Sequence, residues 1–193
     1  DPQTKKKVSR TIATNGKPDA AIAVVDNVNL IDEMTMVLAG LLPVAIHKDP
    51  KTAAVIGMGS GLSSHAMLSF PEFERVDTIE IEKEMVEGAR KFGNQVNNVF
   101  SDNRSTIYIE DAKTFFVRNR RKYDIIISEP SNPWVSGVSS LYSQEFYNLI
   151  NNSLKSDGIF LQWIHLYELD LETLSSIMKA LSSQFADYAL YMT

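Results

Sequence analysis

The sequence predicts an α/β protein built on a doubly wound parallel sheet, with helices on both faces and a small N-terminal β-hairpin. From residue 53 onward, short apolar runs alternate with segments of helical spacing, which is typical of consecutive β–α–β units. A glycine-rich turn follows the first apolar run, at the position where ligands bind in open α/β sheets. With 193 residues, of which 44% are hydrophobic, the chain can bury one substantial core.

The segment that precedes this alternation is predicted to form a hairpin and then a helix. Asn15-Gly16 separates two strand-like runs within residues 8–25, and both residues accept the positive φ angles of a tight hairpin turn. Residues 30–46 have helical spacing, and Asp32 is the expected N-cap.

The remaining elements alternate regularly along the chain. The expected strands are residues 53–57, 76–82, 105–110, 123–130, 158–164 and 188–192. The expected helices are residues 62–70, 83–92, 112–120, 143–154 and 171–185. We therefore expect a hairpin segment over residues 1–30 and a Rossmann-like nucleoside-binding domain over residues 31–193, with functional side chains directly after each strand.

Composition excludes several classes of function. The net charge of −5 disfavours non-specific nucleic-acid binding, and the absence of cysteine excludes disulfide and thiolate chemistry. No apolar run reaches the roughly 18 to 20 residues that span a bilayer, so we expect a cytoplasmic protein. His47, His65 and His165 lie far apart without metal-binding spacing, and we expect no metal.

The turn Gly57-Met58-Gly59-Ser60-Gly61 is the first candidate for a binding site. Its glycines let the backbone approach a ligand and leave amide groups free at a helix N-terminus. A dinucleotide fingerprint requires a third glycine where this chain has Leu62. The spacing is more usual for a nucleoside bound through its ribose and a sulfonium tail, although a tight turn that packs a helix on a strand would use the same glycines.

Carboxylates follow the next two predicted strands. Glu80 and Glu82 lie on one side of their strand, with Ile81 on the other. Glu80 is still within the apolar part of the strand and is the favoured ribose ligand, whereas Glu82 is expected at the surface. Asp111, which precedes Ala112, could accept a hydrogen bond from an adenine amino group or cap the next helix. The residues alone leave both roles of Asp111 open.

The segment after the fourth main strand, "SEPSNPWVSGVSSLYSQEFY", has the composition of an ordered site wall. It contains two prolines, a glycine and a tryptophan. Its polar and aromatic candidates are Glu129, Ser131, Asn132 and Trp134. A proline-stiffened connection is the structural alternative for each of them.

From about residue 15 to residue 170, the chain resembles the spermidine/spermine synthases, the polyamine aminopropyltransferases. The resemblance rests on "HKDPKTAAVIGMGSG", "VDTIEIEKEMVEGARKF", "IEDAKTFF", "KYDIIISEPSNPW" and "SLYSQEFYNLINNSLKSDGIFLQW". It looks closest to bacterial synthase-like domains that are often fused to membrane segments, which implies a membrane-embedded flanking region outside this chain. The resemblance implies a class I S-adenosylmethionine methyltransferase-like fold. It also implies transfer of the aminopropyl group of decarboxylated S-adenosylmethionine to an amine such as putrescine, which leaves methylthioadenosine.

Carried over by position, Glu80 matches the family's ribose-binding carboxylate and Asp111 its adenine-binding acid, which makes ligand binding the favoured role of Asp111. Glu129 matches the first acid of the family's Asp-x-x-Asp loop. The resemblance therefore implies three sets of site residues. They are Gly57, Gly59, Ser60, Gly61, Glu80, Ile81, Asp111 and Ala112 for the cofactor, Glu129 and Asn132 for catalysis, and Ser131 and Trp134 for the acceptor pocket.

The chain departs from the family pattern at three places. Ser60 stands where the family has an aspartate that holds the ammonium of the aminopropyl tail. Asn132 stands where the family has its second acid, and an amide cannot act as a general base at neutral pH. Thr35 and Met36 replace a Tyr-His or Tyr-Gln pair. Since general-base assistance is typically worth ~10²- to 10⁴-fold, we expect weak or altered activity.

Three functions stay open at this point. The first is aminopropyl transfer from decarboxylated S-adenosylmethionine to an amine or polyamine partner. The second is methyl transfer from S-adenosylmethionine, which Ser60 favours because it would not repel that cofactor's carboxylate. The third is a non-catalytic nucleoside- or polyamine-binding domain of a larger membrane protein.

The end of the chain predicts association with a second copy. Residues 188–192 are the last expected strand, and we expect the further edge strand that the resemblance implies to be either missing or supplied by a partner. Because an uncovered sheet edge can pair with another strand, we expect a homodimer that forms through an edge or through the hairpin.

Overall fold

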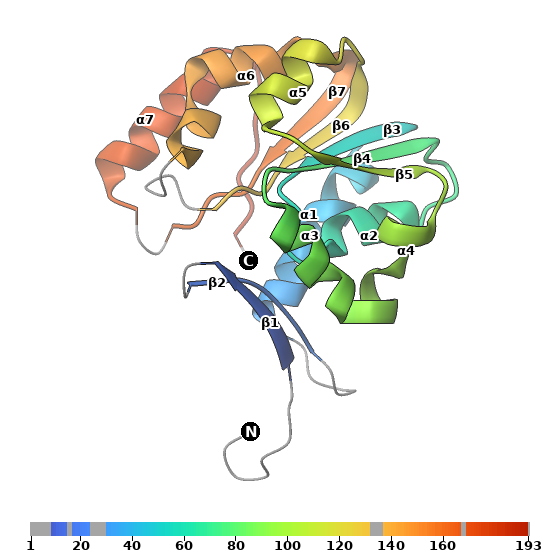
Figure 1. Cartoon of the computed structure of the whole chain (residues 1–193). Coiled ribbons are helices and arrows are strands. Elements are labelled where there is room, and N and C mark those ends of the chain that lie inside the picture. Colours follow the sequence, from blue (N-terminus) through green and yellow to red (C-terminus); the bar gives the residue numbers. More distant parts are fainter. Residues whose placement is uncertain (1–8, 15–16, 24–29, 132–136, 167–168, 193) are drawn as a thin grey trace.

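The computed structural model describes residues 9–14, 17–23, 30–131, 137–166 and 169–192. Its centre is a five-stranded sheet in the order β5-β4-β3-β6-β7, in which every pairing is parallel (Figure 1). The strands are β3 Thr52–Ile56, β4 Arg75–Glu80, β5 Ser105–Ile109, β6 Tyr123–Ser128 and β7 Leu154–Gln162. The chain moves outward from β3 to β5 and then returns to β6. This order confirms the predicted doubly wound sheet and puts its switch point between β3 and β6.

Helices cover both faces of the sheet (Figure 1). One face carries α1 Ile31–Ile46, α2 Leu62–Leu68, α3 Lys83–Ala89 and α4 Asn97–Ser101, and the other carries α5 Ala112–Arg118, α6 Gln144–Asn151 and α7 Leu171–Ser182. Two 3₁₀ helices, η1 Arg90–Val96 and η2 Val138–Tyr142, complete the helical elements of the described residues. None of the helices in the described part of the chain has both the length and the apolar character needed to cross a membrane.

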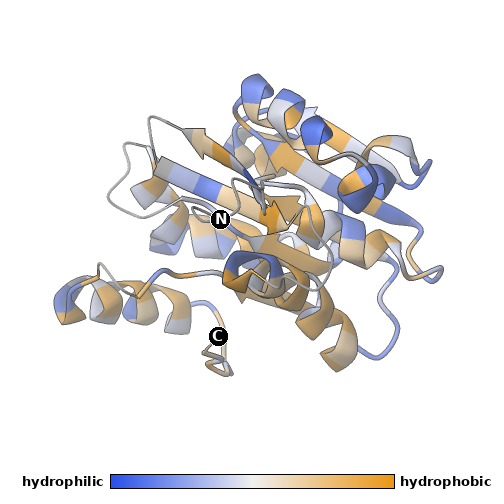
Figure 2. Ribbon diagram, turned by 90° about the horizontal axis from the view of Figure 1, so that it is seen from below, coloured by the Kyte–Doolittle hydropathy of each residue, from blue (hydrophilic) through white to orange (hydrophobic). Residues whose placement is uncertain are grey.

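Alternation along β3 shows why its sequence is a continuous apolar run. Ala53 and Val55 pack against the helices of one face, while Ala54 and Ile56 pack against those of the other. A strand that is buried on both faces has no polar side, which is usual in parallel sheets. Figure 2 accordingly shows much of the central sheet in the colours of hydrophobic residues.

The N-terminal hairpin consists of β1 Ser9–Thr14 and β2 Lys17–Ala23, which pair antiparallel. This confirms the predicted hairpin, although its turn, residues 15–16, lies outside the described residues. Ile22 is fully buried and packs with Leu62, Phe92 and Val96. The hairpin is therefore docked on α2 and η1, next to the glycine turn.

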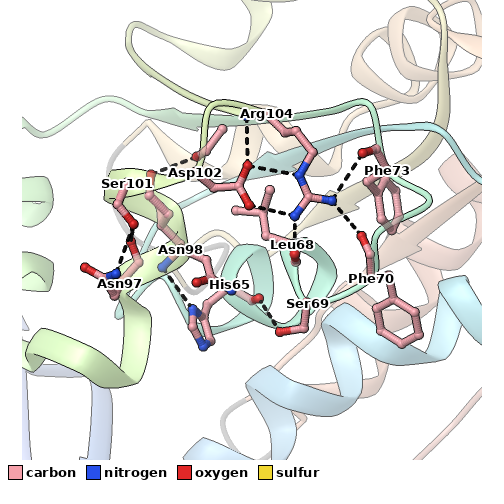
Figure 3. Close-up of polar contacts among 12 residues, drawn as sticks. His65, Leu68, Ser69, Phe70, Phe73, Asn97, Asn98, Ser101, Asp102 and Arg104 are labelled. Carbon is pink, nitrogen blue, oxygen red and sulfur yellow. Dashed lines mark hydrogen bonds and ion pairs between the residues drawn. The ribbon is translucent and has the colours of Figure 1, made fainter.

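Arg104, just before β5, holds the C-terminal end of α2 (Figure 3). Its Nη2 donates to the carbonyl oxygen of Leu68 at 2.6 Å, and its Nη2 and Nε bind the two carboxylate oxygens of Asp102 at 2.6 and 2.9 Å. A cation at this end of a helix satisfies its last carbonyl groups. His65, on α2, accepts a hydrogen bond from the Asn98 amide at 3.2 Å, and burial lowers its pKa. These contacts hold α2 in place at positions away from the glycine turn that precedes the helix.

Three expectations about the elements were wrong, the first being the helix expected over residues 143–154, because Leu154 begins β7. Residues 188–192 form no strand, and Leu190 and Met192 are 74% and 89% exposed. A run of residues with β propensity forms a strand only where a neighbouring strand pairs with it. Helix α1 begins at Ile31 with Leu30 as its N-cap, so Asp32 lies in the first turn, where a carboxylate complements the helix dipole.

Asp124 joins the amino ends of β3 and β6. Its Oδ2 accepts hydrogen bonds from the Lys51 amide at 3.0 Å and the Thr52 amide at 2.8 Å. The Thr52 hydroxyl, at 2.9 Å, and Lys155 Nζ, at 2.8 Å, reach the same oxygen. Burial alone would raise the pKa of Asp124, but these donors outweigh it and lower the pKa to about 2.

Replacing Asp124 with asparagine is expected to lower the free energy of unfolding by about 2 to 3 kcal/mol at pH 7, because a charged acceptor of several hydrogen bonds is lost. Since folding lowers the pKa of this carboxyl, its contribution is present above about pH 4 and is lost as the pH falls towards 2. Urea unfolding at pH 7 and pH 3 measures both effects. The exposed Asp187→Asn is the control. Equal stability of wild type and Asp124→Asn at pH 7 would contradict the prediction.

Candidate active site

The glycine turn lies where the carboxyl ends of three strands meet. It links β3 to α2, and Gly57, Gly59 and Gly61 all have positive φ angles. The Gly57 amide donates to the carbonyl of Ile79 in β4 at 2.9 Å. A Cβ on Gly57 would lie only 2.6 Å from the carbonyl oxygen of Glu129, just after β6. The turn is thus clamped between β4 and the end of β6.

Glu80, the last residue of β4, connects the glycine turn to the carboxyl end of β4. The side chain is buried, with the residue 8% exposed. Its Oε2 accepts from the Met58 amide at 2.8 Å, and its Oε1 accepts from the Glu82 amide at 2.9 Å. Burial raises the pKa of Glu80, and the amides of Glu82 and Met58 partly offset that rise. Each carboxylate oxygen can accept a second hydrogen bond, so Glu80 is positioned to hold ribose hydroxyls.

The two residues that follow Glu80 point to the surface. Ile81 is 63% exposed, and Glu82 is exposed as well. As expected, Glu80 is therefore buried and Glu82 lies at the surface. The exposed apolar side chain of Ile81 is available next to Glu80 to pack against a flat ligand.

Asp111 is the N-cap of α5, at the end of β5. Its Oδ1 accepts both the Thr114 amide, at 2.9 Å, and the Thr114 hydroxyl, at 3.0 Å. The Glu110 amide donates to the carbonyl of Glu80 at 3.1 Å, so the ends of β4 and β5 lie side by side. Because both capping bonds use Oδ1, Oδ2 has no hydrogen bond to any described residue. The cap and the adenine-binding role are compatible.

Glu129 follows β6 and faces α2. The residue as a whole is half-buried, but its Oε1 is buried and has no hydrogen-bond partner among the described residues. Its Oε2 lies 3.0 Å from the hydroxyl of Ser63, which lies equally close to the carbonyl oxygen of Met36. A hydroxyl has one proton, so when Ser63 donates to Met36 its oxygen can accept a hydrogen bond from a protonated Glu129 carboxyl group. Burial raises the pKa of Glu129 to about 7, against a smaller lowering by Ser63.

We expect Glu129→Gln to be more stable than wild type at pH 8 and equally stable at pH 4.5. Folding raises the pKa of Glu129, so the wild-type free energy of unfolding falls between about pH 4.5 and 7, by about 2 to 3 kcal/mol. The amide variant has no proton to lose and should not show this fall. Urea unfolding at both pH values measures the difference, and Glu82→Gln is the exposed control. An unchanged pH dependence in Glu129→Gln would show that the proton is not held there.

Asp19 of the hairpin is a site residue that the sequence did not indicate. Ser131 Oγ donates to Asp19 Oδ1 at 3.4 Å, while Asp19 Oδ2 is buried without a partner among the described residues. The motif "NGKPDA" contained this residue, but its hairpin pattern carried no sign that it would meet the end of β6. The predicted Asn132 and Trp134 lie outside the described residues.

His47, Asp124 and Asp157 form a second polar group, at the opposite end of the sheet. They offer metal-ligand atoms within 4.8 Å of one another, which their spacing in the sequence did not suggest. Lys155 Nζ already contacts Asp124, and the Asp49 amide donates to His47 Nδ1 at 3.2 Å. That bond leaves the imidazole proton on Nε2, the atom that a metal would need. The arrangement therefore favours a structural ion-pair group.

Residues 33–193 match the spermine/spermidine synthase domain. The chain belongs to the spermine/spermidine synthase family. It is 29% identical over 151 residues to a polyamine aminopropyltransferase of Caldicellulosiruptor bescii, covering 78% of this chain and 54% of that protein. It is 32% identical over 120 residues to one from Streptococcus pneumoniae serotype 4, covering 62% of this chain and 42% of that protein. The chain thus spans about half the length of the curated relatives it matches.

Solved structures of the family share this fold. A spermidine synthase of Thermotoga maritima superposes with a TM-score of 0.71 at 24% identity, over 81% of this chain and 52% of that one. A spermidine synthase in complex with the transition-state analogue AdoDATO superposes with a TM-score of 0.70 at 24% identity, over 81% and 51%. These neighbours confirm the class I methyltransferase-like fold.

Two of the positions at which this family member departs from the expected pattern touch each other. Ser60 is fully buried, and its hydroxyl donates to Met36 Sδ at 3.0 Å. The same hydroxyl oxygen accepts from the Leu62 amide at 3.2 Å. The Ser60 hydroxyl therefore occupies the position where the resemblance implies an aspartate, and the Met36 thioether occupies the position of its polar partner. Neither group carries a negative charge.

Proposed function

We propose that this domain binds decarboxylated S-adenosylmethionine and transfers its aminopropyl group to an amine. The observation that carries the proposal is the convergence of Glu80, Asp111 and Glu129 at one end of the sheet, around the glycine turn. Membership of the spermine/spermidine synthase family supports it, as do the names of the relatives and the neighbour solved with AdoDATO. All three carboxyl groups lie at the switch-point edge, where such sheets bind ligands.

Each side chain has a defined part in this proposal. Glu80 accepts the ribose hydroxyls, Asp111 accepts the adenine amino group, and Ile81 and Ala112 line the ring between them. The backbone of Gly57 to Gly61, with Ser60, lines the sulfonium tail. Ser131 and Trp134 border the amine, and Asn132 accepts a hydrogen bond from it.

The reaction is a displacement at carbon. The amine nitrogen attacks the aminopropyl carbon next to the sulfonium, the carbon–sulfur bond breaks, and neutral methylthioadenosine leaves. The new bond makes the nitrogen an ammonium, which passes a proton to Glu129 or to water. A carboxyl group with a pKa of about 7 can both take up and release that proton near neutral pH.

The direct test is the release of methylthioadenosine from decarboxylated S-adenosylmethionine in the presence of putrescine, spermidine or another common diamine. We expect slow release that depends on the amine, with Glu129→Gln slower by about 10²-fold or more. No release with any amine would exclude aminopropyl transfer. If Ser60→Asp combined with Asn132→Asp then created activity, the native domain would be a non-catalytic binder.

Methyl transfer from S-adenosylmethionine is the second candidate, favoured by the uncharged Ser60–Met36 contact. An aspartate at position 60 would repel the carboxylate of that cofactor, whereas a buried hydroxyl does not. Calorimetric titration with both cofactors separates the candidates. Tighter binding of the decarboxylated form supports aminopropyl transfer, and tighter binding of the carboxylated form supports methyl transfer.

We also propose that the protein forms a homodimer. Strand β7 is an edge of the sheet, with no described strand on its outer side. Such an edge pairs readily with a strand of another chain. Light scattering on the purified protein tests this proposal, and a monomeric mass at micromolar concentration would contradict it.

A further inference from the structure

Unpartnered hydrogen-bond acceptors gather beside the proposed amine position. Among the described residues, Asp19 Oδ2, Ser128 Oγ, Glu129 Oε1 and Gln162 Oε1 are buried and have no hydrogen-bond partner. Native proteins satisfy nearly all buried polar atoms, because each unpaired one destabilises the fold. Two of these atoms, Asp19 Oδ2 and Glu129 Oε1, belong to carboxyl groups and therefore indicate a ligand that supplies the donors.

The chain connects these four atoms through one short segment. Ser128 ends β6 and is the register partner of Gln162 at the end of β7, whose Nε2 donates to the Ser128 carbonyl at 3.3 Å. Glu129 follows directly, and Ser131 Oγ then reaches Asp19 at 3.4 Å. Ser128 faces the same side of the sheet as its register partner Ile56, whereas Glu129 faces α2. The segment 129–131 thus connects the Glu129 acceptor to the Asp19 acceptor of the hairpin.

Asp19 and Glu129 offer carboxyl oxygens, whereas the Ser128 hydroxyl can donate as well as accept. Every unpartnered atom is an oxygen that can accept a hydrogen bond, and two of them belong to carboxyl groups. A ligand that offers several N–H donors and positive charge complements such a set, which is the character of an alkyl ammonium. The nucleoside carboxylates, by contrast, already bind backbone amides.

We propose that Asp19 is a specificity-determining residue of the acceptor site, whose carboxylate binds an ammonium group of the amine substrate from the hairpin side. The inference rests on the proposed function for its substrate class. Among the described residues, the side chain of Asp19 makes a single hydrogen bond, the 3.4 Å contact with Ser131, which is at the long end of the hydrogen-bond range. That contact leaves Oδ2 to the ligand. The hairpin would then select positively charged amines and would also cover one side of the site.

The test is calorimetric titration of putrescine and spermidine into protein saturated with methylthioadenosine, for wild type, Asp19→Asn and Asp32→Asn. Asp32→Asn removes the same charge from an exposed position in the first turn of α1 and serves as the matched control. We expect Asp19→Asn to weaken binding of the amines about tenfold or more, because a charged acceptor of an ammonium is lost. Its affinity for methylthioadenosine and its midpoint of thermal unfolding should match those of wild type.

Each other outcome has a distinct meaning. Equal amine affinity in Asp19→Asn and wild type would overturn the role of Asp19 and leave the proposed function standing. Equal weakening in Asp32→Asn would also overturn it, because a general charge effect would then suffice. A loss confined to Asp19→Asn in a protein that releases no methylthioadenosine would support Asp19 and refute aminopropyl transfer. Wild-type protein that binds no amine would refute both.

Discussion

Replacement of Glu80 by glutamine is expected to weaken methylthioadenosine binding by about 100-fold or more. Both carboxylate oxygens accept from backbone amides, Oε2 from Met58 and Oε1 from Glu82. A glutamine side chain has one oxygen and one NH₂ group, so one of these amides would face another donor. The ribose hydroxyls would lose a charged acceptor at the same time. Hydrogen bonds to charged groups contribute roughly 1.5 to 3 kcal/mol each, and 1.4 kcal/mol is a factor of ten.

Calorimetric titration of methylthioadenosine into wild type, Glu80→Gln and Glu82→Gln measures this effect. Glu82 is exposed and is adjacent to the site in sequence, so its amide variant should bind within about threefold of wild type. Urea unfolding of Glu80→Gln separates a loss of binding from a loss of folding. A folded Glu80→Gln variant that binds as tightly as wild type would remove Glu80 from the nucleoside site.

The sheet and the glycine turn could be predicted because their signals are local. A strand buried on both faces, such as β3, must be continuously apolar, and the turn after it must contain glycine wherever φ is positive. Glu80 and Asp111 could be singled out for the same reason, since each follows a strand directly. Residues 188–192 show the limit of local signals: their β propensity is real, but no neighbouring strand pairs with them.

The properties that distinguish the site come from contacts between distant segments. Glu129 could be identified by its position, but the burial that raises its pKa and its contact with Ser63 on α2 come from tertiary packing. Asp19 carries no local signal at all, because only the docking of the hairpin brings it to Ser131. The contact between Ser60 and Met36 likewise depends on how α1 packs against the turn. Neither periodicity nor motif spacing contains such tertiary contacts.

Replacement of Gly57 by alanine is expected to lower the free energy of unfolding by about 3 kcal/mol or more, well beyond the effect of Gly59→Ala. Both glycines have positive φ, +88° at Gly57 and +49° at Gly59, which costs an alanine about 1 to 2 kcal/mol. They differ in the space around them. A Cβ at Gly57 would lie 2.6 Å from the backbone oxygen of Glu129, whereas a Cβ at Gly59 would meet Ala20 Cβ at an ordinary 3.6 Å.

The clash at Gly57 cannot be relieved by a side-chain rotation, because its partner is backbone. The Glu129 amide donates to the Ile56 carbonyl at 2.8 Å and holds the end of β6 against β3, so the added methyl must separate two paired strands. The carboxyl group of Glu129 would then move away from the backbone amides of the glycine turn. Gly57→Ala should therefore also lose methylthioadenosine binding, while Gly59→Ala keeps it. Urea unfolding and calorimetry on the two variants measure both effects. Equal destabilisation by the two alanines would mean that the end of β6 is free to move, and that the site is not clamped by its backbone.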